Sequence, residues 1–186
     1  MNEFRNIIID SRKNIAIGVN YPDAAVSDKR IKIKCLKYSG EGLPFSNHNQ
    51  ATKLNSLYLL NKYLTKIKQL KEEDENRDIQ CRIIINNSLW KTITKGTYKT
   101  WVKIGCYHSN KKPLSKEELK LWEDFSKLYS ELFLEVTFAD LNLYKLNNIK
   151  YNYVNVIYAK KVINKIESIM KEYEDNELDK LFSNIL

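Results

Sequence analysis

The sequence has few residues that interrupt helices and strands, form disulfides or bind metal ions. Its 186 residues include five glycines, three prolines, three cysteines and two histidines. Cys35, Cys81 and Cys106 are odd in number and widely spaced, so no disulfide framework is expected, and two histidines complete no zinc-binding pattern. We therefore expect reduced thiols and an intracellular protein, in the cytoplasm or another reducing compartment.

Long apolar runs are missing as well. No stretch of about 18 apolar residues occurs, so no membrane span is expected, and residues 1–10 lack the features of a signal peptide. Apolar residues nevertheless make up 43% of the chain, which favours a folded domain. The 31 Lys and Arg outnumber the 23 Asp and Glu, and the net charge of +8 favours an acidic partner such as nucleic acid.

Apolar periodicity predicts alternating strands and helices. The expected strands are 6–10, 14–19, 30–37, 81–85 and 133–138, and the expected helices are 50–70, 88–94, 115–131 and 151–173. The first three strands, joined by short links, predict an antiparallel meander. The fourth follows a helix and should lie parallel to the first. The order βββαβααβα predicts an α/β (α+β) domain over residues 1–173, a five-stranded mixed sheet flanked by helices, with a short acidic and apolar tail over 174–186.

The segment from Trp101 to Phe125 is the most distinctive. A basic part containing Trp101 runs to Gly105, which disfavours a helix, and a polar part ends at Pro113. Ser115 and Glu118 then form a capping box, which predicts the start of an amphipathic helix. A basic, aromatic elbow before a docked helix suits a polyanion. It is also what many ordinary surface loops look like, so the elbow alone leaves both interpretations open.

The element order and the elbow together resemble ribonuclease H type 1 over nearly the whole chain. The matching residues in the elbow and the following helix are Trp101, Lys103, Gly105, Lys111, Lys112, Pro113, Leu121 and Trp122. Further matches open the first and last helices, at Asn49, Gln50 and Ala51 and at Asn152 and Ala159. The resemblance implies an RNase H-like fold. It also implies a chemistry in which four carboxylates hold two Mg²⁺ or Mn²⁺ ions at the scissile phosphate.

Most of those carboxylates have no counterpart. Asp10, at the end of the first strand, matches the first one. The other three positions hold uncharged residues: Thr52 (or Asn55 with a register shift of three), Asn87, and Val156 (or Asn155 with a shift of one). One carboxylate does not balance two divalent cations, so we expect no cofactor beyond one weakly held, hydrated ion at Asp10. Equally, Asp10 can simply cap backbone donors at a strand end.

Three other acids, Glu41, Glu135 and Asp140, are candidates to rebuild a metal site. The family's histidine after the fifth strand has no counterpart, because no histidine lies between Phe138 and Asn152. The sequence does not distinguish a natural Asn87 from an engineered one. We therefore predict no ribonuclease activity, with an active, divergent ribonuclease H that uses Mg²⁺ or Mn²⁺ as the alternative.

The resemblance implies binding of RNA or an RNA/DNA hybrid through phosphates and 2′-hydroxyls. The candidate contacts are Lys91, Lys95, Lys99, Trp101, Lys103, Lys111 and Lys112, with Asn86 and Ser88 beside the expected acidic site. Each lysine alone is explained by solubility, so the clustering carries the hypothesis. For Trp90 and Trp122, core packing is the favoured interpretation.

Three hypotheses follow from these observations. The main one is a catalytically degenerate, RNase H-like protein that binds nucleic acid. The second is the divergent ribonuclease. The third is an interaction subunit, in which Glu177, Leu178, Leu181 and Phe182 of the tail dock on a protein partner rather than folding back on their own helix.

Overall fold

The computed structural model describes residues 3–12, 15–22, 32–37, 48–73, 79–107, 110–143 and 162–172. The chain divides into two compact units, Met1–Tyr144 and Lys145–Leu186. In the second unit, residues 162–172 form a helix whose Val162, Ile166 and Met170 are buried four residues apart. The remainder of the predicted helix 151–173, including Asn155 and Val156, lies outside the described residues, as do the tail and Glu41.

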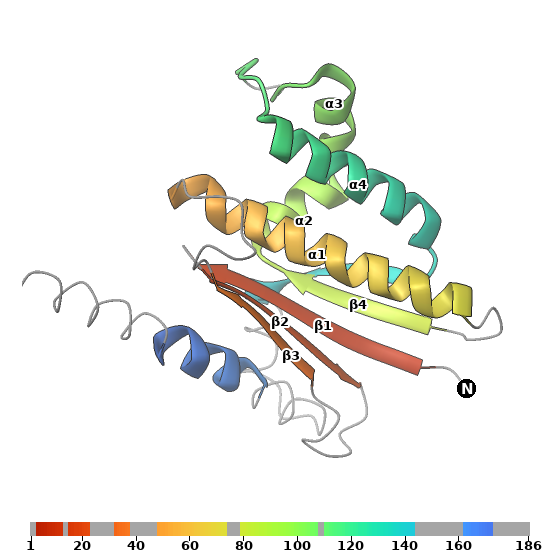
Figure 1. Cartoon of the computed structure of the whole chain (residues 1–186), viewed down its shortest axis with the longest axis vertical. Helices are drawn as coiled ribbons and strands as arrows, with labels where there is room; N and C mark the ends of the chain where they lie inside the picture. The colour runs from red at the N-terminus through yellow and green to blue at the C-terminus, as the bar shows by residue number, and fades with distance from the viewer. Residues whose placement is uncertain are drawn as a thin grey trace, which may run out of the picture. The chain divides into compact units, whose positions relative to one another are not determined.

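A mixed sheet forms the centre of the first unit, with the spatial order β3-β2-β1-β4-β5 (Figure 1). Its strands are β1 (Glu3–Arg12), β2 (Ile15–Pro22), β3 (Lys32–Lys37), β4 (Ile79–Ile85) and β5 (Val136–Asp140). β1, β2 and β3 pair antiparallel, whereas β4 runs parallel to β1 and β5 runs parallel to β4. The mixed α/β class, the meander and the parallel pairing of the first and fourth strands were therefore predicted correctly.

The first unit has four named helices: α1 (His48–Glu73), α2 (Asn87–Thr94), α3 (Thr97–Ile104) and α4 (Lys116–Leu132). α1 lies along one face of the sheet against β1 and β2, and α4 packs on α1 (Figure 1). A short helix, residues 141–143, begins directly after β5. The predicted order had no counterpart to α3, so on this element it was wrong.

α3 is a short helix bounded by two glycines. Gly96 (φ 66°) and Gly105 (φ 69°) both adopt the left-handed conformation, which glycine adopts without a steric cost. Gly105 donates its N–H to the carbonyl of Trp101 and so ends the helix. Tyr98 and Trp101, three residues apart, bury one face of α3. The glycine that the sequence marks as a helix breaker is thus the C-cap of a helix.

The last strand begins later than predicted. Phe133 and Leu134 were assigned to a strand over 133–138, but they lie in the turn after α4 and are 59% and 69% exposed. β5 starts at Val136 and extends to Asp140. The alternation of apolar residues continues across the turn, so the pattern alone does not mark where pairing with β4 begins.

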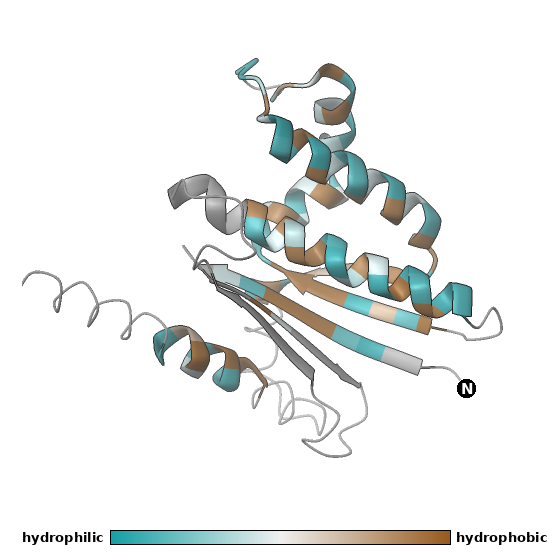
Figure 2. Ribbon diagram, in the orientation of Figure 1, coloured by the Kyte–Doolittle hydropathy of each residue, from teal (hydrophilic) through white to brown (hydrophobic). Residues whose placement is uncertain are grey.

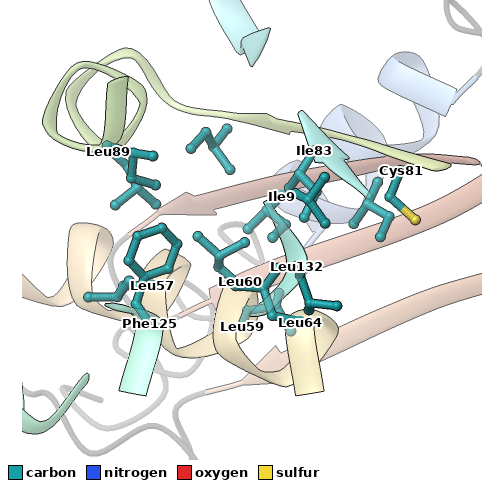
Figure 3. Packing of buried hydrophobic residues seen from close by; sticks show 14 of the residues in the cluster. Ile9, Leu57, Leu59, Leu60, Leu64, Cys81, Ile83, Leu89, Phe125 and Leu132 are labelled. Carbon is teal, nitrogen blue, oxygen red and sulfur yellow. The ribbon is translucent and has the colours of Figure 1, made fainter. Parts of the chain in front are cut away.

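The core lies between the sheet and the two long helices. Leu57, Leu60 and Leu64 of α1 meet Ile9 of β1 and Ile83 of β4 (Figure 3). The apolar middle of β1 and the apolar C-terminal end of β4 stand out in Figure 2, with polar positions spread along α1 and α4. Each of these aliphatic side chains, fully buried, stabilises the fold by roughly 1.5–3 kcal/mol. The stripe predicted for α1 was correct, except that Tyr58 is only half-buried.

β2 and α1 meet at Gly18. A Cβ atom at this position would lie 2.3 Å from Cε2 of Tyr63, so the glycine makes room for the tyrosine ring. Burial raises the pKa of Tyr63 from 10.0 to about 12, because the phenolate would lose its hydration. This close approach packs α1 directly against β2 of the meander.

Candidate nucleic-acid interface and the adjoining strand edge

The carboxyl ends of three parallel strands meet at one edge of the sheet. Ile8 of β1 pairs with Ile84 of β4, and Ile85 of β4 pairs with Asp140 of β5. Asp10 therefore ends up beside the residues that follow β4, with Asp140 on their other side. This edge brings together Asp10, Asn86, Asn87 and Asp140, which the sequence places far apart.

Asp10 is half-buried and its Oδ1 accepts the N–H of Ser11 at 2.9 Å. Ser11 in turn lies 2.5 Å, oxygen to oxygen, from Ser56 of α1. Asn86 donates its Nδ2 to Ser56 Oγ at 3.4 Å, while its Oδ1 accepts the N–H of Leu89 and caps α2. Both ends of the Asn86 side chain therefore contribute to the fold.

Ser56 was missed in the sequence, although it is the α1 residue that reaches this edge. It is fully buried, as is the neighbouring Asn55. Its position directly before Leu57 in the apolar stripe is the only sequence signal, and a serine within an apolar stripe is easily taken for a tolerated polar residue. Thr52 lies one turn earlier in α1, and its side chain lies outside the described part.

Asn87 and Asp140 form a side-chain pair. Asn87, the first residue of α2, donates its Nδ2 to Oδ2 of Asp140. Oδ1 of Asp140 accepts the N–H groups of Asn142 (2.7 Å) and Leu143 (3.2 Å), so the carboxylate also caps the helix after β5. Asp140 is only 3% exposed. Three donors thus occupy the two oxygens of the acid that lies beside Asn87.

Glu135 is not part of this edge. It precedes β5, at the opposite end of that strand from Asp140, and its carboxylate pairs with Lys71 near the end of α1. Glu135 was a candidate metal ligand in the sequence, and its position at the far end of β5 contradicts that role. Within the described ranges, no three His, Cys, Asp or Glu side chains lie close enough together to hold a metal ion.

Exposed lysines follow this edge along the chain, on α2, α3 and the segment after α3. Figure 1 shows where these two helices lie. The six exposed lysines are Lys91, Lys95, Lys99, Lys103, Lys111 and Lys112. The described ion pairs include none of them. We call these six residues the basic surface.

The charge of one segment is entirely positive, which the total of +8 does not reveal. Residues 79–116 contain eight basic residues and no Asp or Glu. The other parts of the chain hold 23 basic and 23 acidic residues, so this segment supplies the whole net charge of +8. The net charge of successive segments, rather than that of the whole chain, reveals this basic segment.

The elbow is a hairpin between Gly105 and Leu114. Cys106 and Pro113 pair antiparallel, Tyr107 donates its N–H to the carbonyl of Lys112 at 2.9 Å, and Leu114 donates to Gly105 at 3.0 Å. Backbone hydrogen bonds therefore hold the ends of this hairpin together. Its two lysines, Lys111 and Lys112, are exposed.

Trp101 is a correction to the predicted interface. It is 9% exposed, and its ring meets the edges of Tyr107 and Trp122 at centroid distances of 5.0 and 5.7 Å. A ring enclosed in this way has no face for a nucleic-acid base. Trp122 is fully buried, as predicted, and Trp90 is half-buried against the core.

The predicted capping box is only half formed. Ser115 Oγ accepts the N–H of Glu118 at 3.1 Å and caps α4. The carboxylate of Glu118 accepts the Tyr107 hydroxyl instead, at 2.5 and 2.6 Å. Burial, and then this hydrogen bond, raises the pKa of Tyr107 well above its ordinary value.

None of the helices in the described part of the chain is long and apolar enough to cross a membrane. No protein-family model matches the sequence, and no curated protein matches it either.

Proposed function

We propose that the chain is an RNase H-like protein that binds RNA or an RNA/DNA hybrid through the basic surface. The observation that carries the proposal is the uniform charge of residues 79–116, displayed on exposed lysines without described acid partners. Lysines that pair with phosphates release condensed counterions, which drives binding of any nucleic acid. An acid among them would weaken that field, and none is present.

The arrangement of the sheet supports the RNase H-like part of the proposal. A three-stranded antiparallel meander, then a long helix, then a fourth strand parallel to the first is the arrangement that the resemblance implies. The basic surface follows directly after β4, next to the edge that holds Asp10. In such a protein, a bound duplex lies across this edge.

We further propose that the edge does not catalyse hydrolysis by two metal ions. Asp10 is one carboxylate, and both oxygens of Asp140 accept hydrogen bonds from Asn87, Asn142 and Leu143. A second divalent ion would need charged oxygens that these residues do not supply.

The experiment is the binding of one labelled RNA/DNA hybrid at several salt concentrations, with and without Mg²⁺ or Mn²⁺. We expect affinity that falls steeply as salt rises, and no cleavage above a protein-free control. Affinity that is absent or insensitive to salt would overturn the proposed binding. Unlabelled duplex DNA and duplex RNA as competitors show which duplex is preferred.

A divergent ribonuclease is the second candidate, favoured by one observation. β5 brings Asp140 next to Asn87, so a second acid flanks the edge that holds Asp10. Activity would require Asp140 to release its three donors and turn to a metal. Metal-dependent cleavage by the parent protein, lost in both Asp10→Asn and Asp140→Asn, would establish this candidate.

A further inference from the structure

Tyr107 joins two parts of the molecule through its two ends. Its hydroxyl reaches Glu118 of α4, which is 1% exposed. Its backbone belongs to the hairpin: the N–H donates to the carbonyl of Lys112, and the carbonyl accepts the N–H of Lys111 at 2.9 Å. A single residue therefore connects a buried carboxylate to both lysines of the hairpin.

The Glu118 end of this connection is firmly held. A buried carboxylate is costly unless hydrogen bonds replace its water. Glu118 lies in the first turn of α4, where the helix dipole favours a negative charge, and both its oxygens lie within 2.6 Å of the Tyr107 hydroxyl. The Tyr107 ring also meets the edge of the buried Trp101.

The lysine end of the connection is strained. Lys111 has φ 52°, a left-handed conformation that side chains other than glycine adopt at a cost. Asn110 accepts the N–H of Lys112 on its Oδ1 at 3.0 Å and supports the same bend. A strained bend of this kind persists only where its surroundings hold it, and the Tyr107 backbone bonds to both lysines.

We propose that Tyr107, held by Glu118, is a positioning residue that fixes the hairpin in the shape that presents Lys111 and Lys112 to phosphates. The inference rests on the proposed function. It adds that the hairpin is preorganised, so that nucleic acid does not have to order it on binding.

The test is a double-mutant cycle on hybrid binding at about 0.1 M salt. Tyr107→Phe removes one hydroxyl, and the charge variant is Lys111→Ala with Lys112→Ala. We expect Tyr107→Phe to weaken binding about three- to ten-fold in the parent and less than about two-fold in the charge variant, because its effect acts through those lysines. It should also lower the salt-dependence slope, by no more than the roughly two units that the two lysines supply.

Three controls separate positioning from loss of structure. Tyr129→Phe removes a hydroxyl from another aromatic residue, on α4, and should leave affinity unchanged. Hydrogen exchange at the Lys111 amide should quicken in Tyr107→Phe while the amides of β4 stay protected. Glu118→Gln, which keeps the shape of the acceptor but not its charge, should show the same coupling with a smaller effect, and serves if Tyr107→Phe does not fold.

Equal losses in the parent and in the charge variant would overturn the positioning role while leaving the proposed function intact. Unchanged affinity in Tyr107→Phe would overturn it in the same way. If the parent protein does not bind the hybrid, the proposed function fails, and the positioning role fails with it.

Discussion

Two surfaces of this protein carry many lysines, and they use them differently. On α1, α4 and the turn after α4, lysines pair with acids: Lys68 lies 2.5 Å from Glu131, Lys120 pairs with Asp124, and Lys71 pairs with Glu135. Lys68, Asp124 and Glu131 line a groove of about 530 Å³, and each is paired with a charge of opposite sign. On α2, α3 and the hairpin, six exposed lysines face solvent with no acid in their segment.

The difference shows why a net charge by itself does not locate a site. The hydrogen bond with Glu131 is the main reason that the pKa of Lys68 is raised, and the same bond lowers the pKa of Glu131. Those charges are already matched within the protein. No described acid pairs with a lysine of the basic surface. Unpaired charge of one sign attracts a polyanion over distances of about a Debye length, roughly 8–10 Å in ordinary salt.

The largest expected effect concerns the packing beneath the basic surface. Trp122 is fully buried and meets Tyr98, Trp101 and Phe125. Trp122→Ala should lower the free energy of unfolding by roughly 3–5 kcal/mol, through lost contacts and a cavity. Chemical denaturation with circular dichroism measures it. A loss below about 1 kcal/mol would mean that this aromatic cluster does not support α3 and the hairpin.

The sequence predicted the parts of the fold that depend on local periodicity. The apolar stripe of α1, the three isoleucines of β1 and the cap at Ser115 are all decided by neighbours a few residues apart. What it missed depends on partners distant in the chain. Glu118 binds Tyr107 rather than closing its capping box, Ser56 meets Ser11 from 45 residues away, and Asn87 meets Asp140 from 53 residues away.

Reversing lysine charges should weaken binding on the basic surface but not on α1 and α4. Lys99→Glu with Lys103→Glu on α3 should weaken hybrid binding at least about 100-fold at 0.1 M salt and flatten its salt dependence, because two phosphate contacts become repulsions. The matched control is Lys66→Glu with Lys127→Glu on α1 and α4, which changes net charge equally. Equal losses in both variants would mean that binding follows total charge and not the basic surface.

The third prediction compares two tyrosines in alkaline solution, Tyr63 beside Gly18 and Tyr107 in the hairpin. Both pKa values are raised in the folded protein, that of Tyr63 from 10.0 to about 12. Above pH 10 the unfolded chain loses these protons first, so the free energy of unfolding should fall as pH rises toward 12. Below pH 10 this contribution is fully retained.

Denaturation midpoints between pH 8 and pH 11.5 measure this fall. Tyr63→Phe and Tyr107→Phe should each make it shallower, because phenylalanine has no proton to lose. A fall equally steep in both variants would assign the alkaline sensitivity to other groups.

The smallest expected effect concerns the lysines of α1 and α4 that form ion pairs. Lys68→Ala removes a partly exposed partner of Glu131 and Glu72. Such pairs contribute little in water, so the melting temperature should fall by no more than about 2–4 °C. Hybrid affinity should stay within about two-fold of the parent. A large loss of affinity in Lys68→Ala would mean that lysines outside the basic surface also bind the hybrid.

The contact between Asn87 and Asp140 makes an acidic side chain at position 87 unfavourable. The amide of Asn87 is a donor, and Asp140 already caps the helix that follows it. A carboxylate introduced at position 87 would face another carboxylate at close range, and the two like charges would repel each other. Asn87→Asp alone would therefore replace a hydrogen bond between two side chains with a repulsion before it added a metal ligand.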